Sequence, residues 1–339
     1  MSKTDDTLTG RIIEIQRLST EDGPGIRTTV FMKGCTMHCL WCHNPESISS
    51  APQLQWIDSR CIGCKTCLKH CNRSALDIDP GGMQIDRLKC QGCGDCAREC
   101  PTNALELIGK MWSVSDLVKE ISKDRSFFMS SGGGITISGG ESTLQYHYVT
   151  EVLKRFKQAG FHTALDTCGL TSQTALASIL PFVDLVLFDL KEMDSTRHLE
   201  YTGSSLQIVL SSLVFICETI RESGKGTDLW IRTPIIPGTT ARPENVQAIG
   251  AYIQNHCLDV VTRWDLLAFN NLCKDKYKRL ETKWFFEDAP LISESEKELL
   301  LQAASDSISN HAIIHWGGNT RLETETANIR NGEQMVVSQ

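Results

Sequence analysis

The sequence predicts an α/β fold: a partial, TIM-like barrel of six parallel strands, with a small α+β module inserted near its start. Short apolar segments alternate with helical patterns along most of the 339 residues, which is typical of parallel strands covered by helices. Six such units are too few for a closed eight-stranded barrel. A cysteine-rich repeat interrupts the alternation, so we expect residues 52–109 to form the insert and residues 1–51 and 110–339 the barrel.

The individual elements can be placed from local patterns. Ser113 or Ser115 is the expected N-cap of a helix that contains Asp116, and Gly160 and Gly224 are expected to end two others. A last helix is expected to follow near the end of the chain. The strand candidates are residues 28–33, 134–138, 162–167, 185–191, 229–236 and 264–270, with 311–316 as a further one.

Polar and cysteine-containing motifs follow each of the six strands. In chain order they read KGC, GGES, DTCG, DLK, IIPG and FNNLC. In parallel α/β barrels the carboxyl ends of the strands build the active face. We therefore expect all six motifs to meet at one mouth of the barrel.

Composition excludes several classes of protein. The chain is 41% hydrophobic and 22% charged, with a net charge of -7, so nothing indicates binding to nucleic acid or to an anionic membrane. The N-terminus is polar and lacks the apolar stretch of a signal peptide. No segment approaches the roughly 20 apolar residues of a membrane span, and we expect a cytoplasmic protein.

Cysteine is unusually frequent. The chain has 15 cysteines, and 11 of them fall between Cys35 and Cys100 at spacings of two or three residues within each group. A reducing cytoplasm argues against structural disulfides, and such spacing is typical of metal ligation. The remaining four, Cys168, Cys217, Cys257 and Cys273, are expected to be buried free thiols.

Residues 61–79 and 90–108 are two copies of one repeat, each with the spacing C-x2-C-x2-C-x3-C. This matches the bacterial two-cluster ferredoxin pattern, in which the fourth cysteine of each copy ligates the cluster of the other. The insert is thus expected to be ferredoxin-like, with two [4Fe-4S] clusters. One would be held by Cys61, Cys64, Cys67 and Cys100, and the other by Cys71, Cys90, Cys93 and Cys96. Paired zinc sites are the alternative, but zinc ligands usually come as separated C-x2-C pairs.

A third group contains only Cys35, Cys39 and Cys42, spaced C-x3-C-x2-C. A closed tetrahedral zinc site or a fully protein-bound four-iron cluster needs four ligands. Either a ligand comes from a distant part of the chain or one metal position is left open. The motifs expected around the same mouth favour an open position that binds a substrate.

This group, with Trp41 before its last cysteine, resembles the radical S-adenosylmethionine (SAM) enzymes. Residues 19–47, STEDGPGIRTTVFMKGCTMHCLWCHNPES, resemble more narrowly the signature of glycyl radical enzyme activating enzymes, and the similarity covers nearly the whole chain. The resemblance implies a radical SAM barrel and an oxidoreductase with a third [4Fe-4S] cluster whose open iron binds SAM. Reductive cleavage of SAM would yield a 5′-deoxyadenosyl radical that abstracts a hydrogen from a backbone glycine of a partner glycyl radical enzyme.

The resemblance also implies residue roles. Gly139, Gly140 and Glu141 would receive the SAM amino group, and Lys191 would hold its carboxylate. Two departures stand out: Ser142 where many members have proline, and Asn270 where many have a histidine that contacts SAM.

Further residues are implied at neighbouring strand ends. Arg232 is a further SAM contact, and Asp166, Thr167 and Asp189 fall where some members bind a monovalent cation. Taken singly, Asp166 and Asp189 would be ordinary helix caps, and Lys191 a surface lysine. His38 and His43 are expected to be local fillers.

The two extra clusters would relay electrons from ferredoxin or flavodoxin, and oxygen-sensitive chemistry indicates an anaerobic host. The partner is expected to be an isethionate sulfite-lyase. The alternatives are an activator of a diol or glycerol dehydratase, a choline lyase or an arylacetate decarboxylase, another radical SAM enzyme such as a peptide maturase, and an electron carrier without enzymatic activity.

Overall fold

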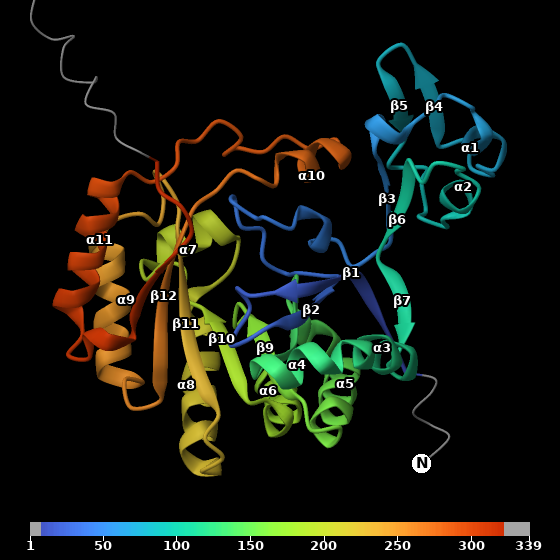
Figure 1. Ribbon diagram of the computed structural model, residues 1–339. Coiled ribbons are helices and arrows are strands. Elements are labelled where there is room, and N and C mark those ends of the chain that lie inside the picture. Colours follow the sequence, from blue (N-terminus) through green and yellow to red (C-terminus); the bar gives the residue numbers. More distant parts are fainter. Residues whose placement is uncertain (1–7, 322–339) are drawn as a thin grey trace, which may run out of the picture.

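The computed structural model describes residues 8–321, and Figure 1 shows a large α/β body with a small module on one side. The main sheet has nine strands in the order β13-β12-β11-β10-β9-β8-β2-β1-β7. Its strands are parallel from β2 to β13, whereas β1 and β7 are added antiparallel beyond β2. The two end strands do not pair with each other in the described chain, so the sheet is open, as predicted for a partial barrel.

The parallel strands confirm the six predicted ones and the further one. They are β2 (Arg27–Met32), β8 (Gly134–Gly139), β9 (His162–Thr167), β10 (Leu185–Asp189), β11 (Asp228–Ile235), β12 (Val261–Ala268) and β13 (Ile314–Gly317). β8 and β10 are buried along nearly their whole length. This is expected for parallel strands, which are covered on both faces.

Two strands of the main sheet were not predicted. β1 (Thr9–Ser19) pairs antiparallel with β2, and its register shifts twice along the pair. β7 (Lys110–Ser113) has only four residues and follows the insert directly. Irregular pairing and shortness weaken the alternating pattern from which strands are predicted.

The barrel part has nine helices in the described chain, and most of them pack on the sheet around one main core, to which α7 and α10 contribute no residue. The nine helices are α3 (Val114–Ile121), α4 (Arg125–Ser131), α5 (Tyr146–Gln158), α6 (Gln173–Ile179), α7 (Ser195–Thr202), α8 (Leu206–Ser223), α9 (Pro243–His256), α10 (Lys274–Arg279) and α11 (Glu294–Ser307). As predicted, the Ser113 hydroxyl accepts a hydrogen bond from the Asp116 amide at 3.0 Å, and α8 ends at Gly224 with φ +58°. No single helix in residues 8–321 is long and apolar enough to cross a membrane, although the bent pair α7–α8 passes the same test by length and composition alone.

Short 3-10 helices lie at Pro45–Ser47, Asp58–Arg60, Ser122–Asp124, Ser142–Gln145, Leu180–Phe182 and His311–Ile313.

The module contains β3 (Gln53–Trp56) paired with β6 (Leu105–Ile108), and β4 (Leu76–Asp79) paired with β5 (Gly82–Ile85). Each copy of the repeat forms a short helix followed by a strand, with α1 (Thr66–Lys69) in the first and α2 (Asp95–Arg98) in the second. The repeat in sequence is therefore a repeat in structure, and the module has its own small core.

Polar contacts fix the module to the barrel. Arg87 follows β5, forms an ion pair with Glu281 at 3.0 Å and donates to the carbonyl of Arg279 at 3.1 Å. Lys33, at the end of β2, donates to Gln53 Oε1 at 2.8 Å. The module is thereby tied to both the strand that precedes the three-cysteine group and the segment around α10.

Candidate active site and cluster sites

A cavity of about 400 Å3 lies where the parallel strands end. Its lining includes the three-cysteine group and nearly all residues implied for SAM or cation binding: Cys35, Cys39, Trp41, Cys42, Gly139, Gly140, Asp166, Thr167, Asp189, Lys191 and Arg232. Asn270 and Ser138 also line it. The strand ends therefore converge as expected, and Glu141 is the one implied cofactor residue outside this lining.

Glycine backbone brings the motif after β8 against the loop that carries the cysteines. Gly139 has φ +113°, a conformation that favours glycine. A Cβ atom on Gly140 would lie 2.1 Å from the carbonyl oxygen of Gly34. The Glu141 amide donates to that same carbonyl at 2.8 Å. Only glycine allows this approach, which holds the backbone of Gly139 and Gly140 at the cavity beside Cys35.

The carboxylate of Glu141 is buried and fully engaged. Its exposure is 1%, and it accepts from the Thr143 amide and hydroxyl at 3.0 and 2.6 Å and from the Thr167 hydroxyl at 2.9 Å. The Cys168 amide adds a bond at 2.9 Å and its thiol another at 3.0 Å. A direct contact from this side chain to SAM is not supported by the geometry. Glu141 instead ties the loops after β8 and β9 together.

Cys168 is a fourth thiol at the cavity. It is 8% exposed, which agrees with the predicted buried thiol, but it also lines the cavity. A hydrogen bond between the Cys168 and Cys35 thiols lowers the pKa of Cys35. The same residue thus touches a predicted cluster ligand and donates to Glu141. Its place in the DTCG motif at a strand end was the signal that sequence reasoning did not use.

We expect Cys168→Ala to lower the free energy of unfolding by about 1–3 kcal/mol, because Glu141 loses a donor to a buried charge. Cys168→Ser keeps a donor and is expected to lose less than half of that. Urea unfolding of the three proteins under anaerobic conditions measures the difference. The iron content of Cys168→Ala should equal that of wild type, since Cys168 is not a predicted ligand; a loss of about four irons would make it a ligand of the cluster.

Charged side chains form a network at the cavity, in which Lys191 is buried and Asp166, Asp189 and Arg232 are partly buried. Arg232 pairs with Asp166 and also donates from Nε to Asp189 Oδ1 at 3.1 Å. Lys191 Nζ donates to Asp189 Oδ2 at 2.6 Å. Ser138 donates to Asp166 Oδ2 at 2.5 Å. Two cations and two carboxylates therefore balance each other at the cavity wall.

The network fixes the charge states of its members. Burial tends to lower the pKa of Lys191 and of Arg232, but the facing carboxylates hold both above their usual values. Burial tends to raise the pKa of Asp189, but Lys191 and Arg232 hold it below its usual range. For Asp166, burial prevails and raises the pKa to about 6, against the opposing effect of Arg232. Lys191 and Arg232 stay charged at neutral pH, which suits an anionic ligand.

Arg232 occupies the space between the two carboxylates that were implied to bind a monovalent cation. The guanidinium of Arg232 contacts Asp166 and Asp189, the two carboxylates implied to bind the cation. A cation placed between these side chains would have to displace Arg232 or bind on their far side. Arg232 supplies the positive charge there in this structure.

The segment from Asn270 to Phe286 packs against the cysteine loop, which sequence reasoning did not foresee. The Tyr277 hydroxyl donates to the Cys42 carbonyl at 2.9 Å, and Lys276 pairs with Glu46 at 2.7 Å. Trp41, 6% exposed, lies in an aromatic cluster with Phe269, Trp284 and Phe286. This segment stabilises the loop around Cys42 over a separation of 235 residues, too long for any local pattern to reveal.

His43 stands next to Asn270 in this segment. The His43 imidazole is hydrogen-bonded to the backbone of Asn270. The imidazole ring also lies 6.1 Å from the ring of Phe269 and 6.2 Å from that of Trp284, measured between ring centres. Both His43 and Asn270 line the cavity. His43 packs against aromatic side chains, as expected for a residue that fills local space. Its position in the lining of the cavity was not predicted.

The cysteines of the module surround two small cavities. One is lined by Cys61, Cys64, Cys67 and Cys100, and the other by Cys71, Cys90, Cys93 and Cys96. These are the two crossed sets that the repeat predicted, with the fourth cysteine of each copy beside the first three of the other. In residues 8–321, no group of three or more His, Cys, Asp or Glu side chains is arranged to hold a single metal ion.

Comparison with known proteins identifies the family. A model described as a 4Fe-4S dicluster domain matches residues 60–104, and one described as a 4Fe-4S single cluster domain matches residues 21–77 and 84–210. The chain is 37% identical to the trans-4-hydroxy-L-proline dehydratase activating enzyme of Clostridioides difficile, over 85% of this chain and 93% of that protein. The chain belongs to the glycyl radical enzyme activating enzymes. This activating enzyme is also 34% identical to the isethionate sulfite-lyase activating enzyme of Nitratidesulfovibrio vulgaris, over 88% of this chain and 96% of that one.

A further relative is the benzylsuccinate synthase activating enzyme of Thauera aromatica, 37% identical over 78% of this chain and 80% of that one. Among solved structures, a radical SAM methyltransferase from Sphaerobacter thermophilus aligns over 90% of this chain and 77% of that one, with 11% identity and a TM-score of 0.49. The activating enzyme is thus an iron–sulfur, radical SAM oxidoreductase that generates a glycyl radical on a partner enzyme. The family confirms the resemblance, and a peptide maturase or a simple electron carrier is not supported.

Proposed function

We propose that this activating enzyme holds three [4Fe-4S] clusters: one on Cys35, Cys39 and Cys42, with its fourth iron open to SAM, and two in a ferredoxin-like insert. The observation that carries the proposal is the grouping of the cysteines around three separate cavities. Two cavities have four thiols each, and the third has the three thiols of the C-x3-C-x2-C group, while the further thiol at that cavity, Cys168, donates to Glu141. Four thiols suit a closed cluster and three suit an open one.

The residues around the largest of these cavities would bind and orient SAM. Lys191 and Arg232, both charged and at the cavity wall, would hold its carboxylate. The backbone of Gly139 and Gly140 would receive its amino group, and Trp41 would shield the cluster from water. The bound SAM and its reduced cluster supply the radical chemistry. The chain's contribution is to position the cofactor and to admit the partner's glycine.

Electrons would enter through the insert from ferredoxin or flavodoxin in the cytoplasm. The insert lies beside the barrel and is fixed to it through Arg87 and Lys33, which supports a constant path from its clusters to the three-cysteine group. An insert that passed no electrons to the three-cysteine group would not need to be held at a fixed position on the barrel. The same contacts support residues 52–109 as one inserted unit.

Iron analysis tests the number of clusters. After anaerobic reconstitution with iron and sulfide, we expect about twelve irons per chain and a reduced-cluster EPR signal that changes when SAM is added. Quantifying methionine and 5′-deoxyadenosine after reduction then tests cleavage. About eight irons with no response to SAM would leave only the insert loaded and would contradict the proposal.

We propose isethionate sulfite-lyase as the partner, with trans-4-hydroxy-L-proline dehydratase as the second candidate. Relatives that activate each of them are 34% and 37% identical to this chain, so identity alone does not rank the sulfite-lyase first. It is placed first because the segments RLSTEDGPGIRTT and LLAFNNLC resemble those of its activators. Each purified partner is incubated with the reduced enzyme and SAM, and the glycyl radical is counted by EPR. A radical on the dehydratase and none on the sulfite-lyase would reverse the assignment.

A further inference from the structure

The two copies of the repeat differ in charge around their cysteines. Residues 61–73 contain three basic residues and no acidic one, whereas residues 90–102 contain one basic and two acidic residues. Lys69 and Arg98 occupy equivalent positions at the ends of α1 and α2. Arg98 is paired with Asp95, while the described structure gives Lys69 no acidic partner. The first copy is therefore a basic element on a chain with a net charge of -7.

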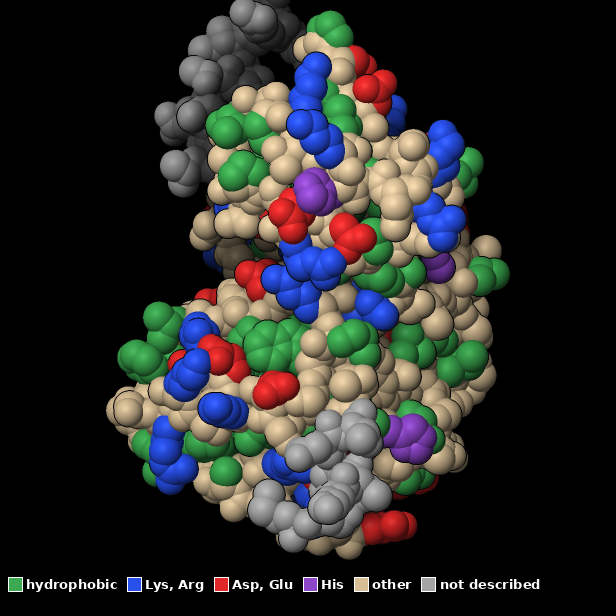
Figure 2. All heavy atoms as spheres, turned by 90° about the vertical axis from the view of Figure 1, so that its right-hand side faces the viewer, with side chains coloured by type: hydrophobic (Ala, Val, Ile, Leu, Met, Phe, Trp, Pro, Cys, Tyr) green, Lys and Arg blue, Asp and Glu red, His purple; other side chains and the backbone are tan. Residues whose placement is uncertain are grey.

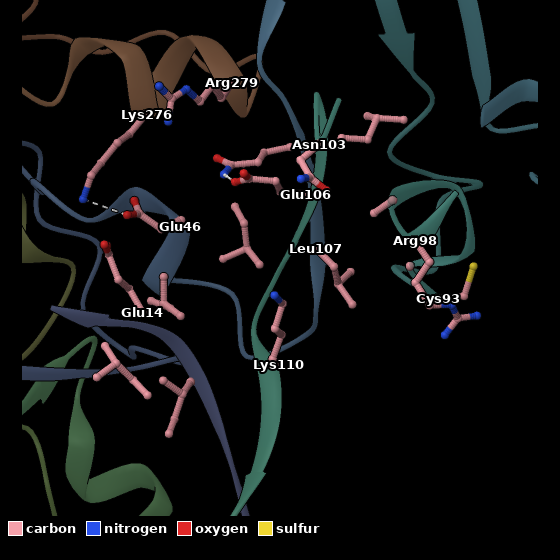
Figure 3. A pocket seen from close by; sticks show the side chains of 18 of the residues that line it. Glu14, Glu46, Cys93, Arg98, Asn103, Glu106, Leu107, Lys110, Lys276 and Arg279 are labelled. Carbon is pink, nitrogen blue, oxygen red and sulfur yellow. Dashed lines mark hydrogen bonds and ion pairs between the residues drawn. The ribbon is translucent and has the colours of Figure 1, made fainter. Parts of the chain in front are cut away.

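The second copy faces the barrel. A groove of about 950 Å3 separates the module from the barrel, and Figure 3 shows Cys93 and Arg98 on its module side and Glu46 and Lys276 on its barrel side. No residue of α1 lines this groove. The cluster predicted on Cys93 thus borders the groove, whereas α1 of the first copy lies on the outer side of the module, away from the barrel (Figure 1).

The outer side presents a mixed apolar and basic surface around one predicted ligand. Cys64 is exposed, and Ile62 beside it is 67% exposed. Lys65 and Lys69 are also exposed. We call Ile62, Cys64, Lys65 and Lys69 the α1 surface. Figure 2, in which this side of the molecule faces the viewer, shows several lysine and arginine side chains over its upper part, with a few acidic ones among them.

We propose that the α1 surface is the docking site of a small acidic protein that carries one electron. The inference rests on the proposed function and adds the place where the electron enters. An acidic face on the carrier complements the unpaired lysines, and Ile62 supplies the apolar centre that such an interface uses. The carrier loses one electron and the cluster on Cys61, Cys64, Cys67 and Cys100 gains it, with no bond made and no proton moved.

This location gives both module clusters a use. An electron that enters at the α1 surface reaches the outer cluster first, and the crossed ligands place the second cluster next to it. The second cluster then lies at the groove, beside the barrel. A carrier bound in the groove would contact only the inner cluster and would leave the outer one outside the route.

The test uses the reconstituted full-length enzyme and reduced flavodoxin as the probe. Stopped-flow absorbance measures how fast flavodoxin reduces the module clusters, without SAM. We expect Lys65→Glu/Lys69→Glu to slow this reduction at least about tenfold at low salt, because charge complementarity governs encounter. The wild-type rate should fall steeply as salt rises, and the variant rate should fall less. Lys69→Glu and its matched control Arg98→Glu change equivalent positions; the control should stay within about twofold of wild type.

Dithionite, which needs no docking, reports whether the clusters of each variant are intact. If the charge-reversal variant Lys65→Glu/Lys69→Glu takes up too little iron, the neutral variant Lys65→Gln/Lys69→Gln is used in its place. A larger effect of Arg98→Glu than of Lys69→Glu would place the carrier in the groove and overturn the proposal, as would equal rates in all variants. Failure of the proposed function looks different: wild type reduced by dithionite would not cleave SAM, while docking would still be measured.

Discussion

Replacing Cys35, Cys39 and Cys42 together by alanine is expected to abolish SAM cleavage and to lower the iron content from about twelve to about eight atoms per chain. All three thiols line the same cavity as Lys191 and Arg232. The eight cysteines of the module surround other cavities, so the two clusters proposed there are expected to be retained. The triple variant should therefore still accept electrons from dithionite but pass none to SAM.

Iron analysis, EPR of the reduced protein and chromatography of 5′-deoxyadenosine measure these effects. Cys217→Ala is the matched control, since Cys217 is a buried thiol in α8, away from the three cavities. It should retain its iron and its activity. If the triple variant still cleaved SAM, or if it lost irons from the module as well, the assignment of an independent open cluster would be wrong.

The part of the site that could be predicted from the sequence consists of residues at the carboxyl ends of the parallel strands. In a parallel sheet, a residue that follows a strand lies at the same edge as every other such residue. This rule brought Asp166, Asp189, Lys191 and Arg232 to one cavity from three separate places in the sequence, at the neighbouring strands β9, β10 and β11. The crossed cysteine sets were predictable for a similar reason, because a repeat of known spacing has one pairing that suits two adjacent clusters.

The same rule could not predict where each side chain points within the cavity. Glu141 follows a strand as required, yet its side chain is buried against Thr143 and Cys168. Contacts between distant loops, such as Tyr277 with Cys42, depend on packing that has no sequence period. β1 and β7 were missed because one is irregularly paired and the other has only four residues.

Arg232→Met is expected to lower the free energy of unfolding by about 3 kcal/mol, the lower end for a buried pair, because it leaves two partly buried carboxylates short of one cation. Arg232 contacts both Asp166 and Asp189, and Lys191 alone would remain to balance them. The double change Arg232→Met/Asp166→Asn removes one charge of each sign. It should recover about half of the lost stability, since Asp189 keeps Lys191.

Anaerobic urea unfolding of the loaded enzyme measures these differences. Arg263→Met is the matched control: Arg263 pairs with Asp265 on the neighbouring strand at 2.8 Å, but its side chain is 36% exposed, so the loss should stay below about 1 kcal/mol. Equal losses in the free energy of unfolding for Arg232→Met and Arg263→Met would contradict the prediction. They would mean that Asp166 and Asp189 do not need Arg232 to offset their charge. A buried ion network is often less stable than an apolar replacement. Its presence at the cavity is therefore better explained by the ligand that we propose for Lys191 and Arg232 than by the stability of the fold.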